Sequence, residues 1–119
     1  MRQFEQAKAD IQQAIRLSPR DPRLGQWRNF LADAEIGLGH CDGAIEQASA
    51  AIDTGYRTYF TYLNLAAAHA FKGEMDEAKT AMAEARALYP KLSVKWLTKR
   101  KPILQPAFEV LRKAGLPEE

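Results

Sequence analysis

The feature of this sequence that most constrains its fold is a repeat at a fixed offset of 34 residues. Shifting residues 25–56 forward by 34 places residues of the same type on one another: Leu31 on Leu65, Ala32 on Ala66, Ala34 on Ala68, Gly39 on Gly73, Asp42 on Asp76, Ala44 on Ala78 and Ala51 on Ala85. Residues 4–19 match the second half of the same unit, residues 75–90. Because units of this length bury their apolar faces only by stacking on a neighbour, the period predicts a helical solenoid.

Apolar spacing and its interruptions predict an all-α fold. Apolar residues recur with the helical period over residues 4–17, 24–38, 42–53, 59–72 and 75–89, and no segment alternates as a strand would. Gly39, Gly55 and Gly73 follow three of these segments, and glycine ends helices readily because it adopts the left-handed conformation. Pro19 and Pro90 stop the other two, since proline cannot continue a helix.

Residues 91–119 do not repeat and are expected to form a C-terminal helical cap. A short helix is predicted after Ser93 as N-cap, Pro102 and Pro106 bend the chain, and a last helix follows at residues 107–113. A solenoid needs such a terminal element to cover its open side. The apolar residues expected to do so are Trp96, Leu97, Phe108 and Leu111.

The repeat residues resemble a tetratricopeptide repeat, whose pattern is W-x2-L-G-x2-Y, A-x3-F and P. The better copy consists of Tyr62, Leu65, Ala66, His69, Ala78, Met82, Ala85 and Pro90, and the weaker one of Arg28, Leu31, Ala32, Glu35, Ala44, Ala48 and Ala51. In the weaker copy Arg28, Glu35 and Tyr56 replace two aromatic residues and a proline. The resemblance covers residues 1–90, as a partial repeat (1–19) and two full repeats (25–56 and 59–90). It implies a right-handed stack of helix pairs, in which small residues sit where the two helices of a pair cross closely: Ala32, Ala44, Ala51, Ala66, Ala78 and Ala85.

The resemblance also implies a binding groove. In tetratricopeptide arrays the first helix of each pair lines the concave face, and the corresponding residues here are Gln26, Asn29, Phe30, Asp33, Phe60, Leu63, Asn64, Ala67 and Phe71. Members that bind carboxylate tails use lysines, arginines and asparagines, of which only Asn29 and Asn64 have counterparts. The expected ligand is therefore an apolar or helical protein segment. The alternative is that Phe60 and Phe71 are covered by the chain's own C-terminal helix.

The first helix is expected to lack its partner, because Met1 falls in the middle of a repeat. An apolar stripe, formed by Phe4, Ala7, Ile11 and Ala14, would then be uncovered. Exposed apolar surface of this kind marks an interface. We expect the chain to be the C-terminal piece of a longer protein; the alternative is a self-association module in which two copies cover the stripe.

Two phrases, residues 17–24 and 111–118, resemble the repeat-bearing C-terminal regions of some bacterial nucleotide cyclases and winged-helix regulators. This resemblance implies a signalling parent with a catalytic or DNA-binding domain upstream. It carries over no catalytic residue, because nothing of a cyclase active site occurs in these 119 residues.

The remaining sequence features argue against catalysis. There is no glycine-rich phosphate loop, and His40, Cys41 and Asp42 are adjacent on a turn, where their side chains cannot converge on one metal. His69 stands at a packing position of the repeat. We therefore expect no enzyme, no metal site and no cofactor.

Charge and composition favour a cytoplasmic interaction module. The net charge is only +2, the single cysteine excludes an internal disulfide, and neither a leader nor a membrane-spanning run occurs. A basic segment at residues 91–101, with Trp96 inside it, leaves nucleic-acid binding as a weaker alternative. Its cations are Lys91, Lys95, Lys99, Arg100 and Lys101.

Overall fold

Every regular element in the computed structural model, which describes residues 2–100 and 107–119, is an α-helix. The helices are α1 (Arg2–Leu17), α2 (Leu24–Gly37), α3 (Cys41–Asp53), α4 (Tyr59–Phe71), α5 (Met75–Leu88), α6 (Val94–Arg100) and α7 (Phe108–Lys113). Each of the first five begins and ends within two residues of its expected bounds. The prediction of an all-helical chain is confirmed for the described residues.

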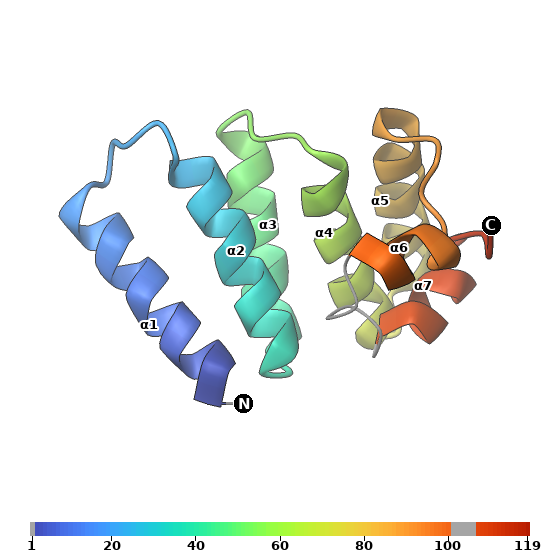
Figure 1. Cartoon of the computed structure of the whole chain (residues 1–119), viewed down its shortest axis with the longest axis horizontal. Helices are drawn as coiled ribbons and strands as arrows, with labels where there is room; N and C mark the ends of the chain where they lie inside the picture. The colour runs from blue at the N-terminus through green and yellow to red at the C-terminus, as the bar shows by residue number, and fades with distance from the viewer. Residues whose placement is uncertain (1, 101–106) are drawn as a thin grey trace.

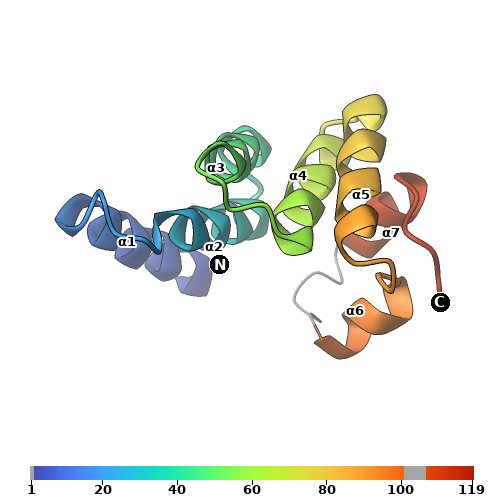
Figure 2. The same ribbon diagram turned by 90° about the horizontal axis from the view of Figure 1, so that it is seen from above.

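Helices α1 to α5 follow one another along the molecule, and each packs against the next one in the chain (Figure 1). Helix α2 contacts α4 as well as α3, so the first helices of the two full repeats are also neighbours. Helices α6 and α7 lie at the opposite end from α1, and α7 packs against α4 (Figure 2). The packed helices measure 41 × 30 × 27 Å along their principal axes.

The helix ends follow from the residues that the sequence singles out. Gly39 and Gly73 have φ angles of +79° and +80°, in the left-handed region that favours glycine. The hydroxyl of Thr58 caps α4 by accepting the backbone N–H of Thr61 at 3.2 Å. The hydroxyl of Ser93 accepts the backbone N–H of Trp96 at 3.0 Å, as predicted for the start of α6. The expected bends at Pro102 and Pro106 lie outside the described residues.

Small residues allow the helices of each pair to approach closely. The alanines that the repeat pattern places at the crossings are completely buried: Ala32, Ala44, Ala51, Ala66, Ala78 and Ala85. Any larger side chain at these positions would have to displace the facing helix, because protein interiors are close-packed.

The largest part of the core lies where α4 and α5 meet the C-terminal helices. Leu63 and Met82 from the last repeat share one buried cluster with Leu97, Phe108 and Leu111. Three of the four apolar residues expected in the C-terminal cap are thus buried against the last repeat, and the fourth, Trp96, packs at its edge. This arrangement decides which face of α4 remains available to a partner.

Candidate binding surfaces

Most of the predicted groove residues belong to the core rather than to the surface. Five of the nine are buried: Asn29, Phe60, Leu63, Asn64 and Ala67. Phe60, Leu63 and Ala67 share an apolar cluster with Phe108 and Leu111 of α7, so little of these three side chains is exposed to a partner. The alternative expectation, coverage by the chain's own C-terminal helix, describes Phe60 but not Phe71.

The two asparagines that resemble a carboxylate clamp bind each other. The side-chain Nδ2 of Asn64 donates a hydrogen bond to Oδ1 of Asn29 at 2.9 Å, and both side chains are buried. This bond joins α4 to α2. The two asparagines therefore help to hold the two repeats together.

Two large aromatic side chains of the predicted set remain exposed. Phe30 on α2 keeps 44% of its surface and Phe71, at the end of α4, keeps 43%, while Gln26 and Asp33 are half-buried. Phe30 also lines a hollow of about 240 Å³ beside the loop between α3 and α4, together with Asn29, Tyr56, Thr58, Tyr59 and Phe60. We use the name phenylalanine face for these two exposed side chains, which are carried by the contacting helices α2 and α4.

The apolar stripe of α1 is half-covered rather than open. No residue of α1 is fully buried, and Phe4, Ala7, Ile11 and Ala14 are all partly exposed. The ring of Phe4 lies directly against α2, because a Cβ added at Gly37 would come within 2.6 Å of it. The expectation of a wholly unpartnered stripe is wrong to this extent, since α1 packs against α2.

In each full repeat a histidine–glutamate pair spans the turn between the two helices, and the sequence had not indicated this pair. Nδ1 of His69 donates to Oε1 of Glu74 at 2.8 Å, and Nδ1 of His40 lies 3.3 Å from Oε1 of Glu35. The repeat offset places Glu35 on His69 and His40 on Glu74, so the two repeats contain the same pair with its members exchanged. Each pair joins the first helix of a repeat to the start of the second.

Glu35 is the more buried carboxylate of the two pairs, with 8% of its surface exposed. Lys8 of α1 donates to the same Oε1 atom at 2.8 Å, so this carboxylate contacts both the Lys8 ammonium and the His40 imidazole. It fits only because residue 43 is glycine: a Cβ there would lie 2.0 Å from Oε2 of Glu35. Glu35, which replaces an aromatic residue of the repeat pattern, therefore has both the space and the polar partners that it needs.

In the last repeat the histidine is the more buried member of the pair and the glutamate the more exposed one, and the contacts extend to the previous repeat. The hydrogen bond from His69, followed by the nearby charge of Lys72, lowers the pKa of Glu74. The ammonium of Lys72 also binds Asp42 at the start of α3, and that contact raises the pKa of Lys72. The bond across to Asp42 links α4 to α3.

The side chains of His40, Cys41 and Asp42, which are residue types that can bind metals, do not converge on one point. His40 binds Glu35 and Asp42 binds Lys72, while partial burial raises the pKa of the Cys41 thiol. Among the described residues, no group of three or more histidine, cysteine, aspartate or glutamate side chains is placed to hold a metal ion.

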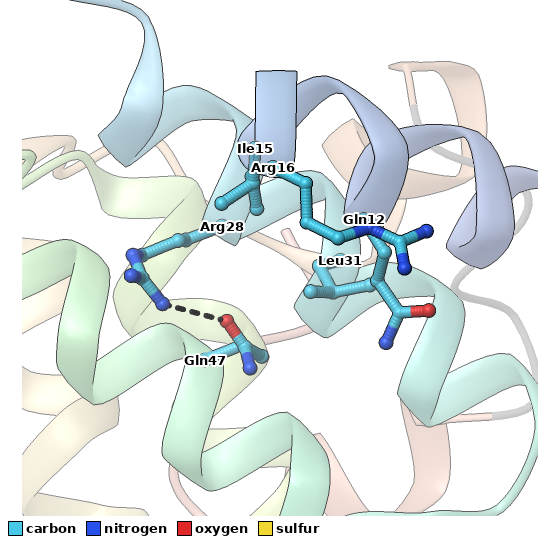
Figure 3. Close-up of a pocket in the computed structure, with 6 residues that line it drawn as sticks. All are labelled: Gln12, Ile15, Arg16, Arg28, Leu31 and Gln47. Carbon is cyan, nitrogen blue, oxygen red and sulfur yellow. Dashed lines mark hydrogen bonds between the residues drawn. The ribbon is translucent and has the colours of Figure 1, made fainter. Parts of the chain in front are cut away.

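A second hollow, of about 370 Å³, opens where α1, α2 and α3 meet (Figure 3). We call it the arginine hollow, and its lining residues are Gln12, Ile15, Arg16, Arg28, Leu31 and Gln47. Nη1 of Arg28 donates to Oε1 of Gln47 at 3.2 Å, and Nη2 of Arg16 donates to Oε1 of Gln13 at 3.1 Å. Neither guanidinium forms an ion pair with a carboxylate of the described residues.

The last repeat has an equivalent hollow of opposite charge. Its volume is about 360 Å³, and its lining residues are Tyr62, Leu65, His69, Asp76, Glu77, Thr80, Ala81 and Glu84. The repeat offset places Arg28, Leu31 and Gln47 on Tyr62, Leu65 and Ala81. The leucine is thus common to both hollows, whereas the arginine and the glutamine are particular to the first.

The basic segment at the start of the C-terminal part is only partly available. The ring of Trp96 lies 5.0 Å from that of Tyr89 and 5.7 Å from that of Tyr59, so it belongs to an aromatic cluster. The guanidinium of Arg100 lies 5.7 Å from the centre of the Trp96 ring. Lys101 lies outside the described residues. These contacts use Trp96 for packing and leave the lysines of α6 exposed.

Comparisons with protein-family models, with curated proteins and with solved structures find no match to this chain. Within the described ranges, no helix combines the length and the apolar character needed to cross a bilayer. The function must therefore be inferred from the surfaces described above.

Proposed function

We propose that this chain is a protein-interaction module of the tetratricopeptide kind, and that it binds a partner protein through the phenylalanine face. The repeat offset, the buried alanines at the crossings and the packing of each helix on the next support a right-handed solenoid of helix pairs. The resemblance of residues 17–24 and 111–118 supports a bacterial cytoplasmic signalling parent.

The observation that carries this proposal is the exposure of Phe30 and Phe71. Both keep more than two fifths of their surface in a chain that buries Phe60 and Phe108 well. Aromatic side chains supply much of the energy of protein interfaces, and large exposed ones on a rigid helix lose little entropy on binding. An apolar or helical segment is the ligand that such a face fits best.

Photo-crosslinking tests the proposal while the partner is still unidentified. A photoreactive phenylalanine analogue at position 30 or 71, in the cell that expresses the chain, is expected to give one discrete protein adduct from both positions. The same analogue at Ala83, which is exposed on α5, is the matched control. The proposal would be contradicted if positions 30 and 71 gave no adduct, or if position 83 gave the same adduct.

The same experiment supplies the partner for an affinity measurement. Phe30→Ala is expected to weaken binding by roughly tenfold or more, as for an aromatic residue at the centre of an interface. The thermal unfolding midpoint should change little, because so much of the Phe30 side chain is already exposed.

Self-association is the second candidate function, and the half-covered face of α1 favours it. Helix α1 lies at one end of the molecule, packs against α2 and has no fully buried residue (Figure 1). A second copy could cover the stripe of Phe4, Ala7, Ile11 and Ala14.

Light scattering coupled to size exclusion tests this second function. If two copies pair through α1, the chain is expected to elute as a dimer, and Ile11→Asp is expected to elute as a monomer because it places a charge in the apolar interface. Asp10→Asn, on the exposed side of α1, is the control. A monomer at every concentration of the unmodified chain would rule out this function.

A further inference from the structure

The arginine hollow carries positive charge at a position where the repeat pattern has an aromatic residue, because Arg28 stands there. At the equivalent position the last repeat has Tyr62, and its hollow contains no arginine. Arg28 and Phe30 are two residues apart on α2, which is about 200° around the helix axis. The hollow therefore lies on a different side of α2 from the phenylalanine face.

The two guanidinium groups at the hollow have unused hydrogen-bond donors. A guanidinium has five N–H donors, and the bond from Arg28 to Gln47 uses one of them. Nε of Arg28 is buried and has no acceptor among the residues that the structure describes. A buried donor without an acceptor is costly, so a carboxylate that reached Nε after a shift of the Arg28 side chain would remove a penalty as well as add a bond.

The arrangement of the lining residues fits a single anionic group beside an aliphatic one. Figure 3 shows Arg28 and Gln47 on one side of the hollow and Arg16 and Gln12 on the other, with Leu31 between them. The planar guanidinium binds a carboxylate through two parallel hydrogen bonds, and the glutamine amides offer further donors. Leu31 and Ile15 supply the apolar contact.

The charge around the hollow disfavours nucleic acid. A nucleic acid would require a run of cations along its backbone, whereas this hollow has two. The equivalent hollow of the next repeat presents Asp76, Glu77 and Glu84, none of which forms an ion pair with a described cation. A polyanion that extended along the repeats would meet these carboxylates.

We propose that the arginine hollow is a second binding site, which holds a glutamate or aspartate side chain, next to an aliphatic residue, from a segment of a partner protein. Arg28 binds the carboxylate beside Gln47, and Ile15 and Leu31 contact the neighbouring aliphatic side chain, while Arg16 adds positive charge at the far side of the hollow. The site differs from the phenylalanine face in both position and chemistry. It requires neither Phe30 nor Phe71.

Two matched peptides test this site on the full chain. The first is a short helical peptide of alanine, leucine and glutamate, acetylated and amidated at its ends, and the second has glutamine in place of glutamate. We expect the glutamate peptide to bind about tenfold to a hundredfold more tightly, because hydrogen bonds to charged groups contribute that much. Equal binding of the two peptides would overturn the proposal.

Substitutions at Arg28 locate the binding. Arg28→Tyr restores the residue type of the last repeat and is expected to abolish the preference for glutamate, and Arg28→Lys is expected to keep only part of it. Arg86→Tyr makes the same change at an exposed position of α5 and should leave binding unchanged, as should Phe30→Ala. If Arg28→Tyr fails to fold, the test is the preference of Arg28→Lys for the glutamate peptide over the glutamine peptide. Full preference in Arg28→Lys would contradict the two-bond geometry.

Two competitors separate this site from a general anion site. Inorganic phosphate is expected to displace the glutamate peptide only at much higher concentration, because it makes no aliphatic contact. A single-stranded oligothymidylate is expected not to compete. Displacement by either one at the concentration of the peptide itself would overturn the assignment to a protein segment. Nuclear magnetic resonance gives a direct readout, since the Nε–H signal of Arg28 should shift when the glutamate peptide is added.

Discussion

Phe60→Ala is expected to lower the free energy of unfolding by about 3–5 kcal/mol, the range for removing a buried phenylalanine. Only 9% of Phe60 is exposed, and the ring belongs to the cluster in which α4 meets the C-terminal helices. Phe71→Ala is expected to cost about 1 kcal/mol or less, because it leaves a much smaller cavity at a half-exposed position. Urea denaturation followed by circular dichroism measures both losses.

The contrast between the two phenylalanines is what the structure adds. Their positions on α4, at residues 60 and 71, gave no reason in the sequence to separate them. Leu111→Ala serves as the positive control, because Leu111 is completely buried on the other side of the same cluster. Similar losses for Phe60→Ala and Phe71→Ala would mean that α7 does not pack against α4 as described.

The helices themselves could be predicted from sequence because their signals are local. The period of apolar residues, the glycines after the helices and the Ser93 cap each act over a few residues, and each is found where it was expected. The buried alanines were also predicted, because the copies of a repeat can be aligned with one another within a single sequence. Local rules and an internal repeat thus give the order and the bounds of the helices.

The available surface could not be predicted, because it depends on contacts between distant segments. The family pattern assigns a side of α4 to a groove, but Phe108 and Leu111, more than forty residues further along, cover much of it. The arginine hollow likewise combines residues from three helices. Its one local signal was the departure of Arg28 from the repeat pattern, which indicated only a degenerate repeat.

Glu35→Ala is expected to cost about 1.5–3 kcal/mol, because it removes a carboxylate that binds both Lys8 and His40. The loss should be smaller than for a fully buried ion pair, since the side chains of Lys8 and His40 are partly exposed. Glu46→Ala on the exposed side of α3 is the control, with an expected cost of about 0.5 kcal/mol or less. Thermal and urea unfolding measure the differences.

The exchanged pair in the last repeat provides a stricter test of the same contact. Glu35→His alone should be strongly destabilising, because it places an imidazole between Lys8 and His40. Adding His40→Glu recreates the arrangement of His69 and Glu74, and a double-mutant cycle is expected to show a favourable coupling of about 0.5–1 kcal/mol or more. Full recovery is not expected, since Lys8 still lacks its original carboxylate. If the two changes are additive, the histidine–glutamate pair contributes nothing, and the burial of Glu35 is supported by Lys8 alone.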